Sequence, residues 1–164
     1  MLNKTRIFSA ACLSVVALTG PLVLAQSDNM GSGGMMISDA ISRNGFLMEN
    51  GMLIPAFDPA KGRKLFGSKG CVVCHSINGV GGEDAPDLSA ANMEKPMNAF
   101  EFAARMWRGA PAMIAMQEDE LDAQIELNGE ELAAIIAFAH DAKEQAKFSK
   151  ADVPEEFLKM LEAD

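Results

Sequence analysis

The sequence predicts an all-α fold, and three observations support this prediction. Asp58 followed by proline is typical of a helix N-terminus. Asn98 and Asn128 can each cap a further helix. No segment has a pattern that argues for a strand, and the chain contains no internal repeat. The length of 164 residues suggests one domain with extensions.

The first two expected helices flank a glycine-rich stretch. The first begins after Asp58 and runs to about residue 67, with Gly62 and Phe66 four positions apart on one face. The second runs from residue 99 to about 108, where a glycine and a proline follow that should end it. Residues 111–127 are then expected to form a methionine-containing loop.

Two more helices complete the prediction. After Asn128, apolar residues recur at positions i, i+3, i+4 and i+7, as on a helix buried on one side: Leu132, Ile135, Ile136 and Ala139. This helix is expected to extend to about residue 147. A tail helix from about Pro154 should pack back on the domain through Phe157, Leu158 and Leu161.

The N-terminal segment has the pattern of a secretory signal. Lys4 and Arg6 precede an apolar stretch, and a cleavage site is expected after Ala25. A retained membrane anchor is the alternative, although the stretch barely reaches the roughly 18 apolar residues that a spanning helix needs. We divide the chain into a signal peptide (1–25), a flexible or extended arm (26–57), a domain (58–147) and a tail helix (148–164).

The chain is acidic, with a formal net charge of −9. Cleavage after Ala25 removes two cations and no anions, which brings the mature chain to about −11 by count. An acidic surface disfavours nucleic acid and suits protein partners with a basic docking face. Contact with a membrane is expected only if the signal segment is retained.

The most informative segment is Cys71-Val72-Val73-Cys74-His75. Cys-x-x-Cys-His is the attachment signature of a c-type haem. Two thiols at this spacing can reach the two vinyl groups of one porphyrin, and the histidine that follows can bind the iron. We therefore expect one covalently attached haem c, held by Cys71 and Cys74, with His75 as an iron ligand.

Two other interpretations of these residues stay open. A structural zinc site needs four ligands, and beyond the N-terminal segment the chain adds only His140 to the three residues of the motif. A thioredoxin-like dithiol pair would need a βαβ context, and no strand-rich pattern flanks the motif.

The order of these features resembles the class I c-type cytochromes, over about residues 58–141. Four separated pieces carry the resemblance: Gly62-x-x-x-Phe66, the haem motif, Ala85-Pro86-Asp87-Leu88 and Ala137-Phe138. It implies three to five helices around one covalently bound haem c, with Gly62 packed against Phe138. It also implies that the carbonyl of Pro86 accepts a hydrogen bond from His75 Nδ1. Ala85 departs from the family pattern, which has glycine there.

The resemblance implies a second axial ligand from the loop before the last core helix. That stretch contains Met113 and Met116. Met113 is preferred, because the run from Trp107 through Pro111 to Met113 resembles that of a bacterial subgroup in which this methionine binds the iron. Met116 is the alternative. His140 is expected to be a partly exposed surface histidine.

Two residues of this run have less specific expected roles. Trp107 is expected to contact a haem propionate or the core. Arg108 is expected either to neutralise a propionate or to be solvated.

Three functions fit this picture. The first is a periplasmic bacterial electron carrier that is not an enzyme, with both axial positions of the iron filled by His75 and Met113. The second is a cytochrome c subunit held in a larger respiratory or dehydrogenase complex by its extensions. The third is a haem enzyme or gas sensor with a labile sixth ligand, which rapid binding of carbon monoxide by the reduced protein would favour.

Overall fold

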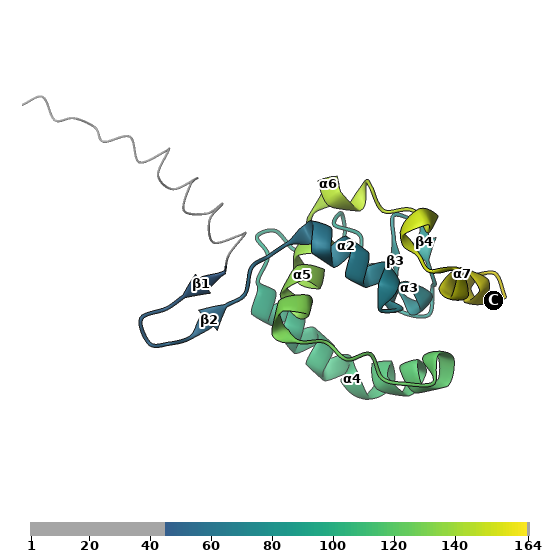
Figure 1. Ribbon diagram of the computed structural model, residues 1–164, viewed down its shortest axis with the longest axis horizontal. Coiled ribbons are helices and arrows are strands. Elements are labelled where there is room, and N and C mark those ends of the chain that lie inside the picture. Colours follow the sequence, from purple (N-terminus) through teal and green to yellow (C-terminus); the bar gives the residue numbers. More distant parts are fainter. Residues whose placement is uncertain (1–44, 164) are drawn as a thin grey trace, which may run out of the picture.

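The centre of the fold is a close crossing of two helices, α2 (Pro59–Ser68) and α5 (Gly129–His140) (Figure 1). The computed structural model describes residues 45–163. Both helices begin as expected. Asp58 accepts a hydrogen bond from the backbone N–H of Lys61, and Asn128 forms a reciprocal capping box with Glu131. The all-α prediction is confirmed.

Gly62 is the reason that the two helices can cross so closely. A Cβ atom at this position would lie 2.0 Å from the backbone oxygen of Ala134 and 2.7 Å from Cβ of Phe138. No side chain fits in that space, so glycine is required for its small size. The expected contact between Gly62 and Phe138 is therefore present.

Aromatic rings fill the core beside this crossing. The rings of Phe66 and Phe138 are fully buried, with centroids 5.8 Å apart, and Phe148 packs edge-on against both. The tail helix α7 (Glu155–Leu161) packs against this cluster through the three apolar residues predicted from its sequence: Phe157, Leu158 and Leu161.

An ion-pair network ties the C-terminal segment to α2. Arg63 of α2 donates to Glu144 in α6 (Ala142–Gln145) and to Asp152 in the 3-10 helix η1 (Lys150–Asp152). Glu144 also pairs with Lys147.

The core helix ends earlier than expected. Helix α5 stops at His140, and Asp141, in an extended conformation, caps the separate helix α6.

The helix that starts after Asn98 is longer than predicted. Instead of ending near residue 108, α4 (Ala99–Leu121) continues through Pro111. The expected loop therefore begins only at Asp122, which has a left-handed conformation with φ 59°. The helix continues although Pro111 removes one backbone hydrogen bond, and half-buried residues recur along one face beyond the proline.

Short strands form two hairpins that the sequence did not predict. One joins β1 (Phe46–Leu47) to β2 (Leu53–Ile54), and the other joins β3 (Ser76–Ile77) to β4 (Val80–Gly81). The first hairpin projects away from the helices (Figure 1), in a region where the sequence predicted a flexible or extended arm. The proposed signal segment and the rest of the arm lie outside the described residues.

Among residues 45–163, no helix is both long and apolar enough to span a membrane.

Candidate haem site

The haem motif forms a single helical turn, α3 (Cys71–Cys74). Positions i and i+3 of a helix lie on one face, so both cysteines project from the same side of the turn. Val72 and Val73 between them are buried and anchor the turn in the protein. His75 follows in an extended conformation, and its backbone N–H donates to the carbonyl of Cys71. The motif thus presents two thiols and an imidazole from one short, rigid segment.

Backbone hydrogen bonds hold the following loop alongside the motif. The N–H groups of Gly82, Ala85 and Leu88 donate to the carbonyls of Val72, Cys74 and Ser76 at 2.9 to 3.0 Å. A Cβ atom on Gly82 would lie 1.9 Å from the oxygen of Val73, which explains the glycine at this position. The loop therefore runs directly past His75.

This arrangement brings Pro86 to the imidazole of His75. Nδ1 of the histidine lies 2.8 Å from the carbonyl oxygen of Pro86. A carbonyl can only accept, so Nδ1 carries the proton and Nε2 has its lone pair available for a metal ion. Ala85 does not have a positive φ, so alanine replaces the family's glycine without strain.

The environment of Cys71 argues against a redox-active thiol. Burial raises the pKa of the Cys71 thiol to about 11. Reactive cysteines, by contrast, have lowered pKa values because the thiolate is the nucleophile and the metal ligand. Among the described residues, no group of three or more His, Cys, Asp or Glu side chains is placed to hold a metal ion. A buried thiol with a raised pKa does not fit a reactive dithiol.

The methionines considered as second ligand lie on α4, not in a loop. Both Met113 and Met116 are half-buried. Gln117 is the buried residue of this helix, and its Oε1 accepts from the backbone N–H of Ile125 at 2.9 Å. At 3.6 residues per turn, Met113 is about 40° and Met116 about 100° from Gln117 around the helix axis. Met113 therefore lies closer to the inner face.

The end of α4 reaches the beginning of the haem motif. A Cβ atom on Gly70 would lie 3.1 Å from Cδ1 of Leu121. Leu121 follows Met113 at a spacing of two helical turns. The structure thus gathers Cys71, Cys74, His75 and Pro86 in one place, while Met113 comes from a separate helix that runs up to it.

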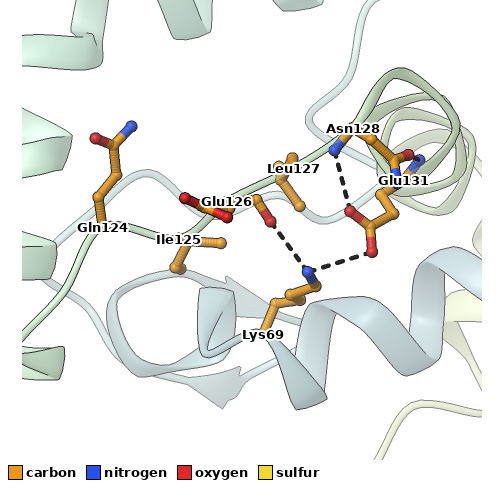
Figure 2. Close-up of a pocket in the computed structure, with 7 residues that line it drawn as sticks. All are labelled: Lys69, Gln124, Ile125, Glu126, Leu127, Asn128 and Glu131. Atoms are coloured by element: carbon orange, nitrogen blue, oxygen red, sulfur yellow. Dashed lines mark hydrogen bonds and ion pairs between the residues drawn. The ribbon is translucent and has the colours of Figure 1, made fainter.

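A lysine that the sequence analysis did not single out connects the segment before the haem motif to the loop after α4. Lys69, two residues before Cys71, extends toward the loop between α4 and α5 (Figure 2). Its Nζ lies 3.0 Å from the carbonyl of Glu126 and 3.2 Å from a carboxylate oxygen of Glu131. No motif signals this role, because the partners are more than 50 positions away in sequence.

Three other residues considered from the sequence have clear positions. Trp107 is 82% exposed, so it is not a core contact. Arg108 forms an exposed ion pair with Glu101 at 2.9 Å. His140 is half-buried, with Nδ1 2.9 Å from the carbonyl of Ile136 and its ring against Phe102.

Comparison with known proteins agrees with this geometry. The family model described as Cytochrome c matches residues 59–143. No curated protein and no solved structure matches the chain. The matched range contains α2, the haem motif, the loop with Pro86, α4 and α5.

Proposed function

The chain belongs to the cytochrome c family, and on this premise we propose that it is a periplasmic monohaem cytochrome whose iron is bound by His75 and Met113. The family match implies covalently bound haem c and electron transfer to protein partners. Haem c supplies an iron that alternates between the ferrous and ferric states. The polypeptide attaches this group, orients the ligand rings and sets the surroundings.

The observation that carries the proposal is the hydrogen bond from His75 Nδ1 to Pro86. It fixes the imidazole ring and leaves Nε2 for iron, on the segment that also presents Cys71 and Cys74. A hydrogen bond of this kind makes the histidine a stronger electron donor. In this proposal the two cysteines form thioethers with one haem, and His75 is the proximal ligand.

The position of Met113 supports its role as the opposite ligand. Its proximity to the inner face of α4, marked by Gln117, favours it over Met116. A thioether ligand stabilises ferrous iron and raises the potential. With both axial positions filled, the protein would pass electrons without binding a substrate at iron, as expected of a carrier and not of an enzyme.

Charge on the described surface supports a basic partner. Several acidic residues that form no ion pair within residues 45–163 gather around the end of α4 and the loop after it: Glu118, Asp119, Glu120 and Asp122. Such a face attracts a positively charged protein surface and speeds encounter at low salt. The periplasmic location rests on the signal-like N-terminus.

The mass of the protein isolated from its own host tests this proposal. We expect the polypeptide mass without residues 1–25, plus that of one haem. Cys71→Ser and Cys74→Ser should each leave a single thioether or none. A mass equal to the bare polypeptide would contradict covalent attachment, and a mass with two haems would contradict the monohaem assignment.

A second candidate function, a subunit of a larger oxidoreductase, is favoured by the β1–β2 hairpin. Five apolar side chains of this hairpin are exposed to solvent: Phe46, Leu47, Met48, Met52 and Leu53. Contiguous exposed apolar surface is typical of protein interaction sites. A subunit can bury this surface against its partner.

Native purification separates the two candidates. A free carrier elutes alone from the periplasmic fraction, whereas a subunit co-purifies with its enzyme. Replacing both Leu47 and Leu53 with serine should release a subunit from the complex. Phe100→Ser, at an exposed apolar position on α4, is the matched control that should leave the complex intact.

A further inference from the structure

A buried glutamine joins the protein core to the loop that carries Pro86. Gln145, at the end of α6, is only 1% exposed. Its Nε2 donates to the carbonyl oxygens of Phe138 and Leu88, each at 3.0 Å. Its Oε1 accepts from the backbone N–H of Ala90 at 2.7 Å. All three partners are backbone groups, so the amide acts as a fixed connector.

Two of these partners belong to the segment just after Pro86. Leu88 and Ala90 follow the proline by two and four positions, and Ala90 is itself buried. The third partner, Phe138, lies in the aromatic core. The side chain therefore fixes the Pro86 loop relative to the helix crossing.

Removal of this amide would leave buried backbone groups without partners. The Ala90 N–H and the Leu88 carbonyl would each lose a hydrogen bond away from bulk water, which favours rearrangement of the loop. Elsewhere the loop is held to the haem motif by the backbone hydrogen bonds from Ala85 and Leu88, and Asp87 accepts locally from the N–H and Oγ of Ser89. Those bonds hold the loop to the motif, whereas the Gln145 amide connects the same loop to the helix core.

We propose that Gln145 is a positioning residue for the axial histidine. By holding Leu88 and Ala90 it keeps the Pro86 carbonyl at hydrogen-bond distance from His75 Nδ1, and so keeps the imidazole oriented and electron-rich. This inference rests on the proposed role of His75 as an iron ligand. Gln145 itself lies beyond the residues that the family model matches.

The sign of the effect follows from the hydrogen bond. When the Pro86 carbonyl moves away, the imidazole donates less electron density to iron, and ferric iron loses more stabilisation than ferrous iron. The reduction potential should therefore rise. The Nδ1 proton of His75 should also exchange faster with solvent, because its acceptor is no longer held in place.

The test compares Gln145→Leu with the wild type as intact haem-containing proteins. We expect the equilibrium constant for reduction to rise about threefold, which is about 28 mV for a one-electron couple. In NMR spectra, exchange of the His75 Nδ1 proton should accelerate about tenfold or more. Val153→Ala is the control, because it truncates a buried core side chain that makes no hydrogen bond to the loop.

The outcomes separate this inference from the proposed function. If Gln145→Leu and Val153→Ala show the same potential and the same Nδ1 exchange at matched stability, Gln145 has only a structural role and the inference is wrong. If wild-type spectra show no histidine on the iron, the proposed function itself fails. Should Gln145→Leu not fold, Gln145→Asn provides the same test, because it keeps the amide but shortens its reach by one methylene group.

Discussion

The carbonyl group of Pro86 determines how His75 presents its imidazole. The sequence motif and its resemblance to known cytochromes predicted this contact, because both residues belong to short local patterns. The residues that hold the contact in place were not predictable in the same way. Gln145 and Lys69 act through partners more than 50 positions away, and no spacing rule connects such distant residues.

Replacement of Met113 tests the second axial ligand. Met113→Ala should abolish the weak far-red ferric absorption band of methionine ligation and lower the reduction potential, because the thioether that stabilises ferrous iron is lost. Absorption spectra and a redox titration measure both effects. Met116→Ala is the matched control on the same helix. If the band disappears in this control and persists in Met113→Ala, the assignment is reversed.

Among the elements, helix starts were predicted better than helix ends. The caps at Asp58, Asn98 and Asn128 depend on local side-chain hydrogen bonds, which can be identified from the sequence. The end of α4 depends instead on packing beyond Pro111, which a propensity rule cannot anticipate. For the same reason, the second-ligand candidates were expected in a loop and lie in a helix.

The α2–α5 crossing predicts a large difference in the free energy of unfolding between two glycine substitutions. Gly62→Ala should lower the free energy of unfolding by about 3 kcal/mol, because its Cβ would overlap the α5 backbone and force the helices apart. Gly109→Ala on α4 meets nothing within 4 Å and should be stabilising by up to about 1 kcal/mol. Denaturant unfolding of both variants measures these changes. Equal stability of the two would contradict the close crossing.

For the molecule as a whole, the Arg63 network links stability to pH. Hydrogen bonds from Lys147 and Arg63 hold the pKa of Glu144 below its ordinary value of 4.5. A carboxyl group with a lowered pKa in the folded state contributes stability above its unfolded pKa. That contribution is lost as the pH falls through the folded pKa.

Glu144→Gln should therefore lower the free energy of unfolding by about 2 kcal/mol near neutral pH. The difference from the wild type should shrink as the pH drops below 4.5. Unfolding curves measured from pH 7 to pH 3 test this dependence. Glu155→Gln, which breaks an exposed pair with Lys159, is the control and should change stability by less than about 0.5 kcal/mol. If the stability difference between Glu144→Gln and the wild type stays constant with pH, the ionisation of Glu144 is not linked to stability in this way.

Haem removal should destabilise α4 more than the α2–α5 crossing. The α2–α5 crossing has its own buried aromatic core, whereas Gln117 is the buried residue along all of α4. A helix with so little buried surface depends on other contacts for its stability, and in our proposal Met113 gives it one through iron. The haem-free Cys71→Ser/Cys74→Ser variant should therefore be largely unfolded overall. Hydrogen exchange should show α4 amides without protection and residual protection confined to α5. Protection of α4 equal to that of α5 in this variant would mean that the helix does not rely on the haem, and would argue against an iron ligand on it.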